Sequence, residues 1–111
     1  GGFPEWWAVP TLPLAVMLSL VVVAELEEAD LGERFELSVQ VLHPTSERDV
    51  LAAVEIFRGR DQPRTPGTPI RAVSAASIQV PFRAEGVHLF TVSHEEARVA
   101  TVPLALKLRP A

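Results

Sequence analysis

Two apolar stretches decide the fold: Leu12-Pro-Leu-Ala-Val-Met-Leu-Ser-Leu-Val-Val-Val-Ala-Glu-Leu26 and Phe35-Glu-Leu-Ser-Val-Gln-Val-Leu42. In the first stretch every even position from Leu14 onward is apolar, and the odd positions mix apolar, small and acidic residues. In the second stretch the odd positions are apolar and the even ones up to Gln40 are polar. A hydrophobic period of two is typical of strands that pack one face on a core. Both stretches are therefore predicted to be β-strands.

Four more strands are predicted further along the chain, at residues 50–57, 77–82, 87–93 and 98–108. Most are bounded by Pro, Gly or clusters of polar residues, which mark turns. Residues 50–57 also fit a helical period, but their β-branched ends and the following Gly59 favour a strand. Residues 14–26 are long for one strand, so we expect a bend or bulge near Ser19. One helical turn is expected within residues 27–31, followed by Gly32 at positive φ.

This pattern predicts an all-β fold, an immunoglobulin-like antiparallel sandwich of about six or seven strands. The chain has 111 residues, the size of one domain, so residues 1–111 are assigned to a single β-sandwich domain. Residues 1–13 are rich in Pro and Trp and are expected to form an irregular lead-in. Because the chain starts at Gly1-Gly2 without a methionine, we also expect an N-terminal strand to be missing.

The composition restricts the classes of function. Apolar residues make up 48% and charged residues 22%, which is typical of a globular protein. The chain has no cysteine, so it has neither a disulfide framework nor thiolate chemistry, and we expect a cytoplasmic localisation. The net charge of −4 argues against a nucleic-acid-binding surface.

The apolar run at residues 6–24 has about the length of a membrane-spanning helix. Pro10 and Pro13 interrupt its first half, and the β-branched residues 21–23 favour a strand. No Lys or Arg precedes Arg34, so the positive flank of a signal peptide or a membrane anchor is absent from residues 1–33. We therefore predict no membrane span.

The order of these features resembles a known family. The Pro-rich lead-in, the long apolar strand and the acidic turn are followed by a Pro/Gly crossover, a Gly86-Val-His-Leu-Phe90 strand and a Val102-Pro-Leu-Ala-Leu106 ending. This is similar to a family of small bacterial β-sandwich proteins, common in actinobacteria, that has no assigned activity. The resemblance implies an immunoglobulin-type sandwich and one more strand before Gly1. The chain has no Tyr, so it lacks the tyrosine corner of many such domains.

The residues that bear chemistry do not form a recognisable catalytic motif. Only His43, His88 and His94 carry imidazoles, and alternation places His88 and His94 on one face of one strand. A small metal-dependent enzyme built on that pair is the least favoured reading, because no third ligand accompanies them. The acidic turn at residues 27–30 lacks the spacing of a calcium loop. We therefore predict that the protein is not an enzyme and has no catalytic, cofactor-binding or metal-binding residues and no cofactor.

Arg58, Arg60 and Arg64 form a local basic run with Arg71, in a predicted crossover loop. Such a run could grip a phosphate or an acidic partner, including the acidic turn of another copy. A solvated loop explains the same charges.

Phe3, Trp6 and Trp7 form the other candidate interaction site. Paired aromatic residues on a Pro-rich segment serve as anchors at protein interfaces or as stacking platforms for carbohydrate. They also plug the ends of β-sandwiches. From these features we expect a non-catalytic binding or assembly module that acts through a strand edge, loops or the N-terminal aromatic segment, with a protein partner or as a homo-oligomer. The alternative is a carbohydrate- or small-ligand-binding module that uses Trp6 and Trp7.

Overall fold

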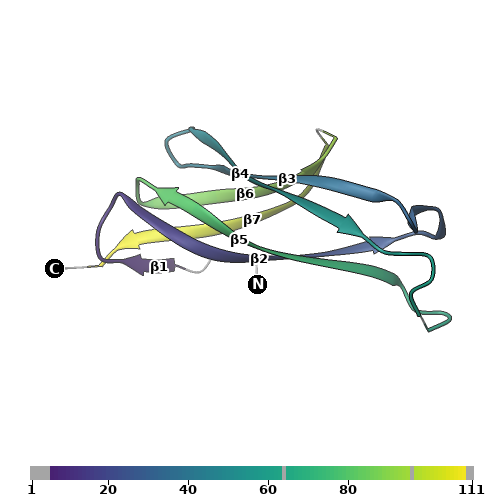
Figure 1. The fold of residues 1–111 in the computed structure, drawn as a ribbon. Helices are drawn as coiled ribbons and strands as arrows, with labels where there is room; N and C mark the ends of the chain where they lie inside the picture. The colour runs from purple at the N-terminus through teal and green to yellow at the C-terminus, as the bar shows by residue number, and fades with distance from the viewer. Residues whose placement is uncertain (1–5, 64, 96, 110–111) are drawn as a thin grey trace.

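The fold was analysed in a computed structural model that describes residues 6–63, 65–95 and 97–109. Seven strands make up most of this part of the chain (Figure 1). They are β1 (Trp6–Val9), β2 (Leu14–Leu26), β3 (Arg34–Leu42), β4 (Arg48–Phe57), β5 (Ile70–Phe82), β6 (Gly86–His94) and β7 (Ala97–Leu108). The one helical segment among these residues is the 3-10 turn η1 (Glu28–Asp30), within the predicted range.

The strands form two sheets of unequal size that pack face to face. One sheet has five strands in the order β1-β7-β6-β3-β4, and the other has only β2 and β5 (Figure 1). The predicted all-β sandwich of six or seven strands is therefore confirmed, with seven strands among the described residues. The segment at residues 50–57 is a strand, as predicted, and it pairs with β3.

The lead-in is more regular than the sequence suggested. Residues 6–9 form β1, which pairs with the end of β7 and matches Trp6 to Ala105 and Val9 to Leu108. This pairing is parallel, and it is the one exception among the ladders described to the predicted antiparallel arrangement. The prediction of an irregular segment was wrong here, because the strand that pairs with residues 6–9 lies about 100 residues further along the chain.

The predicted bend or bulge near Ser19 is absent. β2 and β5 pair in one unbroken antiparallel ladder of thirteen residues, in which Ser19 lies directly opposite Ser77. Register shifts occur instead in the larger sheet, between Val39 and Gln40 and between Val92 and Ser93. The prediction was wrong because β5 is as long as β2, so no extra residue has to be accommodated.

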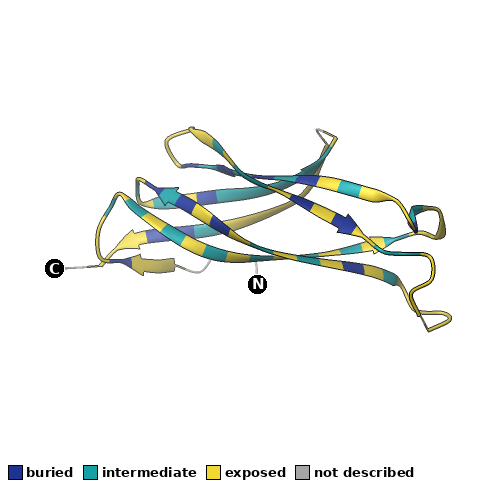
Figure 2. Ribbon diagram, viewed as in Figure 1, coloured by how far each residue is buried: buried dark blue, intermediate teal, exposed yellow. Residues whose placement is uncertain are grey.

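The larger core cluster lies at the end of the sandwich that contains β1, where buried segments of several strands meet (Figure 2). Its fully buried residues are Val41 of β3, Val80 and Phe82 of β5, and Leu106 of β7. A second, smaller cluster around Leu37, Ile56 and Ala72 lies toward the other end of the sandwich. Most of the apolar residues packed on this second cluster are only partly buried: Val22, Ala24, Leu26, Phe35 and Val92. The sandwich is therefore well filled at one end and incompletely covered at the other.

Gly86 begins β6 in a conformation that favours glycine, with φ of 126°. A Cβ atom at this position would lie 2.9 Å from Cγ of Pro44. We expect Gly86→Ala to lower the free energy of unfolding by about 3 kcal/mol, because it adds a steric clash to an unfavourable φ.

Gly67 is the matched control, because its φ is 82° and nothing lies within 4 Å of the position of its Cβ. Gly67→Ala should cost only about 1 kcal/mol, the price of the left-handed conformation. Urea unfolding of both variants checks this, and equal losses would contradict the assigned contact with Pro44.

Candidate functional site

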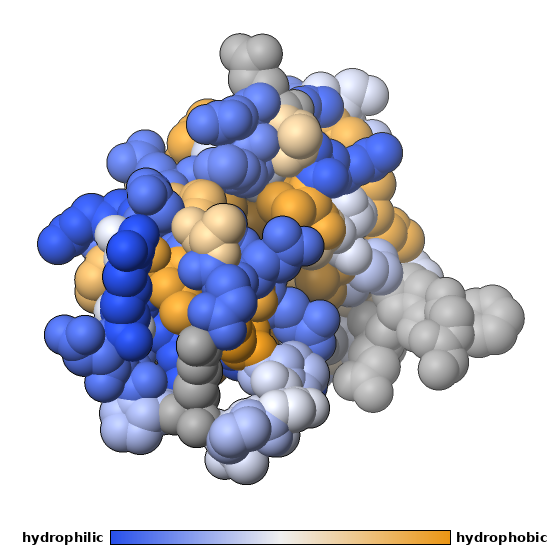
Figure 3. All heavy atoms as spheres, turned by 90° about the vertical axis from the view of Figure 1, so that its right-hand side faces the viewer, coloured by the Kyte–Doolittle hydropathy of each residue, from blue (hydrophilic) through white to orange (hydrophobic). Residues whose placement is uncertain are grey.

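An open side of the sandwich is its most distinctive surface. A groove of about 570 Å³ runs between the second half of β2 and the first half of β7. Its walls are mainly apolar and include Leu20 and Val22 from β2 and Val99 and Val102 from β7. Its floor includes Phe35, from the smaller core cluster. In Figure 3, which looks onto the end where β2 finishes, apolar surface shows between the polar side chains.

The inner face of β2 shows how incomplete this side is. All seven even positions from Leu14 to Leu26 point inward, and each is only half-buried. The inward residues of β5 are better covered, and Ala72, Ile78, Val80 and Phe82 are at most 5% exposed. β5 has β2 on one side and β4 alongside on the other, whereas β2 pairs on one side alone among the described strands. The half-buried face of β2 therefore lies at an edge that has no neighbour among the described strands.

The edges that face the groove differ in how they are protected. Residues of β7 before Ala105 have no partner on the groove side in the described chain, but this edge carries Arg98 and Pro103. A charge and a proline are common means by which proteins prevent strand pairing at an edge. β2 has neither a proline nor a register shift, and its one charged residue is Glu25. The edge of β2 is thus long, regular and unprotected.

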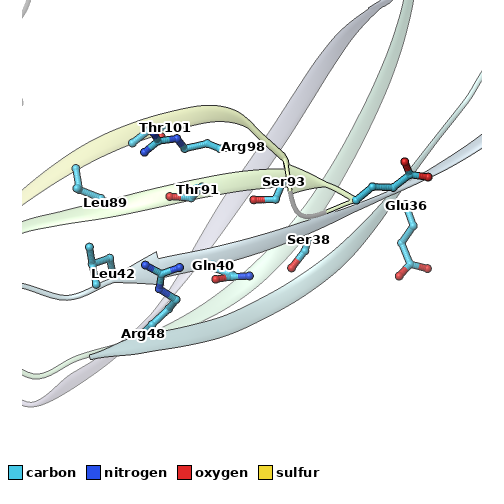
Figure 4. Close-up of a pocket in the computed structure, with 11 residues that line it drawn as sticks. Glu36, Ser38, Gln40, Leu42, Arg48, Leu89, Thr91, Ser93, Arg98 and Thr101 are labelled. Atoms are coloured by element: carbon cyan, nitrogen blue, oxygen red, sulfur yellow. The ribbon is translucent and has the colours of Figure 1, made fainter. Parts of the chain in front are cut away.

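A polar hollow of about 740 Å³ lies on the outer face of the larger sheet (Figure 4). Its centre is lined by the amide of Gln40 and the hydroxyl groups of Ser38, Thr91 and Thr101, which come from three neighbouring strands. Further out lie two arginines and two glutamates: Arg48, Arg98, Glu36 and Glu95. Such side chains are usual on the solvent face of a sheet. Among the lining residues there is no aromatic ring on which a sugar could stack.

Trp6 and Trp7 lie on β1, where they are 60% and 43% exposed. Neighbouring residues of a strand point to opposite faces, so the two rings do not form one stacking platform. Trp6 borders a shallow apolar hollow with Gly86 and Leu106, close to the end of β7. Phe3 lies outside the described residues. The role of the three aromatic residues in interaction stays a prediction, and a sugar would meet each tryptophan ring separately.

Two arginines of the basic run hold loops together through hydrogen bonds. The guanidinium of Arg58 donates to the carbonyls of Arg71 at 2.6 Å and Pro63 at 3.0 Å. Nε of Arg60 donates to the carbonyl of Leu31 at 3.1 Å, across the acidic turn. Arg64 lies outside the described residues. Arg58 and Arg60 therefore stabilise the crossover and the turn, and their proposed contact with a partner stays a prediction.

A pair of buried histidines forms part of the larger core cluster. His88 is fully buried and meets the rings of Phe82 and His43 edge-on, at centroid distances of 4.9 Å and 5.2 Å. Nδ1–H of His88 donates to the carbonyl of Gly86, while its Nε2 is buried without a hydrogen-bond partner. Nε2–H of His43 donates to the carboxylate of Asp49 at 2.7 Å.

The surroundings of these groups shift two pKa values. Burial lowers the pKa of His88, since desolvation penalises the imidazolium. The hydrogen bond from His43, supported by Arg83, lowers the pKa of Asp49. His88 packs as a core aromatic residue between Phe82 and His43, and it lines none of the three hollows described above.

His94 does not join His88. It closes β6 at the other end of the strand, where its ring packs edge-on against Phe35 at 5.6 Å. Within the described chain, no three of the His, Asp and Glu side chains come together as metal ligands do. Alternation in the sequence paired His88 with His94 and did not indicate His43. The β3–β6 register places Val41 opposite Phe90, and so brings His43, two residues after Val41, beside His88, two residues before Phe90.

The comparisons with known proteins add no identification. Neither protein-family models, curated protein sequences nor solved structures gave a match to this chain. The resemblance to an actinobacterial sandwich family therefore stays a prediction. As for membranes, none of the helices in the described ranges has the length and apolarity to cross one.

The buried state of His88 predicts a stability that depends on pH. The pKa of His88 is lowered in the folded protein, so the unfolded chain takes up the proton more readily as the pH falls below about 6.5. The free energy of unfolding should therefore decrease from pH 7 to pH 5. His88→Gln should flatten this dependence, as measured by thermal unfolding across that pH range.

His94→Gln is the control, because His94 is partly exposed and lies at the other end of β6. It should leave the slope of stability against pH unchanged. If His94→Gln flattens the profile and His88→Gln does not, the assignment to His88 is wrong.

Proposed function

We propose that the protein is a non-catalytic binding or assembly module that accepts an extended polypeptide strand at its open side, between β2 and β7. The observation that carries this proposal is the half-burial of every inward side chain along β2. Apolar surface gains roughly 25 cal/mol for each Å² removed from water, so a strand laid beside β2 would be stabilised along its whole length.

The strand order supports the same position. In immunoglobulin-like sandwiches one sheet contains strands A, B, E and D, and the other contains strands C, F and G with additions beside C. On that scheme β2 and β5 correspond to B and E, and β7, β6, β3 and β4 to G, F, C and C′. The edge of β2 that has no neighbour among the described strands is then the position of strand A.

The groove also defines what kind of strand would fit. Backbone N–H and C=O groups on the free edge of β2 can pair with any extended chain, which supplies affinity without regard to sequence. Alternate side chains of the added strand would point toward Val99, Val102 and Phe35, so these side chains should be apolar. The accepted segment is therefore an extended strand with apolar residues at every second position.

Photo-crosslinking with synthetic peptides tests the proposal. A photoreactive phenylalanine analogue would replace Val99, which is exposed and lines the groove. The probe is a pool of peptides, each about as long as β2, with apolar residues at alternate positions. We expect this pool to crosslink at position 99 at least about five times more than a pool of the same composition with the apolar residues clustered.

The matched control carries the same analogue at Val50, which is 72% exposed on β4 and does not line the groove. Peptide labelling at position 50 should be low and equal for the two pools. Labelling that is equal at both positions, or indifferent to alternation, would rule out strand addition at the groove.

A further inference from the structure

We infer that the strand accepted at the open side runs antiparallel to β2 and carries Lys or Arg at its N-terminal end. This inference rests on the proposed function and names the chemistry of the partner. The partner is a polypeptide segment that is basic at its first outward positions and apolar at the inward positions between them. The part of the groove that selects it is its acidic end, which is formed by Glu25, Leu26 and Asp30.

The carboxylates of the groove lie together at one end. Glu25 is the second-last residue of β2, and Asp30 ends η1, the turn that follows β2. Apart from His94, these two are the ionisable side chains among the described residues that line the groove, and no Lys or Arg lines it there. The rest of the lining is apolar. A segment whose positive charges are gathered at one end is therefore attracted in one orientation only.

Both carboxylates can accept a further positive partner. Glu25 lies 3.8 Å from the guanidinium of Arg71 on β5, and the two side chains are 70% and 58% exposed, so this ion pair is loose. Oδ2 of Asp30 accepts the backbone N–H of Glu27 at 2.8 Å. A carboxylate accepts several hydrogen bonds, so this contact within the turn leaves Asp30 able to meet a cation.

The opposite end of the groove has the opposite charge. There β1 pairs with the end of β7, and Lys107 lies opposite Ala8. Arg109 follows β7, and its backbone N–H donates to the carbonyl of Val9 at 2.8 Å. Residues 10–18, which lead into β2 and begin it, include no carboxylate. The basic end of a bound segment is therefore favoured beside Glu25 and disfavoured beside Lys107.

The direction of the strand follows from these charges. An antiparallel strand brings its N-terminal end to the end of β2, and directly opposite residues of such a pair lie on the same face. A Lys opposite Glu25 would thus point outward beside its carboxylate, while the residues opposite Ala24 and Leu26 would point into the groove. Strand A of immunoglobulin-like sandwiches is also antiparallel to strand B, which agrees with this direction.

The acidic end lies away from the part of the groove that is nearest to β1. It is beside the start of β7, where Val99 and Ala100 line the groove, whereas β1 pairs with residues 105–108. β2 ends and β7 begins on the right-hand side of Figure 1, and β1 lies on the left. The selection of basic residues therefore depends on described side chains alone.

Two peptides of identical composition test the inference. Each has thirteen residues, the length of β2, with apolar residues at alternate positions and with acetylated and amidated ends. One carries Lys at its first two outward positions, and the other carries Lys at its last two. With the photoreactive analogue at Val99, the first peptide should reach half-maximal labelling at a concentration about fivefold lower.

The labelled residue of the peptide gives the direction independently. Val99 belongs to the first half of β7, which lies across the groove from the second half of β2. Mass spectrometry of the crosslinked product should therefore place the label in the N-terminal half of the peptide. A label in the C-terminal half contradicts the antiparallel direction and overturns the inference.

The double variant Glu25→Gln with Asp30→Asn should remove the preference between the peptides, because both new side chains are neutral. Asn at position 30 retains an oxygen that can accept the N–H of Glu27, so the turn is preserved. The matched control is Glu36→Gln with Glu47→Gln, which removes the same charge from residues that do not line the groove. The control should keep the fivefold preference of about the same size as the parent chain.

Each other result has one meaning. Equal labelling by the two peptides in the parent chain, or equal loss of the preference in both double variants, overturns the inference. Strand addition still stands in that case if alternating peptides label position 99 more than clustered ones, and the proposed function fails as well if they do not. A crosslink from position 99 to a second copy or to residues 1–5, in place of the peptide, names another occupant and also overturns the inference.

Discussion

The structure depends on one mismatch: a two-stranded sheet has to cover a five-stranded one. Neighbouring strands lie about 4.8 Å apart, so β2 and β5 cover less than half the width of the opposing sheet. Their unbroken ladder of thirteen pairs fixes where that cover goes. β5 lies alongside β4 and seals one side of the sandwich, and β1 closes the opposite side at one end only. The groove beside β2 is the part of the core that β2 and β5 leave uncovered.

The well-buried end of the sandwich is filled by aromatic side chains. Phe82, His88 and His43 stack edge-on in a row where β3, β5 and β6 converge. Using histidines for this purpose leaves buried nitrogens without partners, Nδ1 of His43 and Nε2 of His88. Burial lowers the pKa of His88, because desolvation penalises the imidazolium, so the uncharged ring is favoured at that position. His88 therefore acts mainly through packing. The open end of the sandwich has a single edge-on pair, Phe35 with His94, among partly buried aliphatic residues.

The sequence predicts what is local. Alternation identified β2, β3, β4, β6 and β7 as strands but only the second half of β5, whose residues 70–76 were not predicted. The acidic turn with Gly32 at positive φ was correctly expected, as was η1 within it. What failed depends on partners distant in sequence. β1 exists because β7 is there to pair with it, β2 needs no bulge because β5 matches its length, and His43 meets His88 through the β3–β6 register. The groove could not be predicted for the same reason. The half-burial of β2 depends on which strands lie beside it, and alternation within β2 does not reveal them.

A strand edge is a stronger functional indication in this protein than the polar hollow on the larger sheet. The face around Gln40 and Thr91 is lined mainly by polar and charged side chains, as is usual where a sheet faces solvent. At β2, the backbone groups on the edge that has no partner among the described strands lie next to apolar side chains, which water does not stabilise. Soluble proteins usually guard such an edge with a charge, a proline or a bulge, and β7 does so with Arg98 and Pro103. The one charged residue of β2 is Glu25, near one end, so most of this edge carries no such guard.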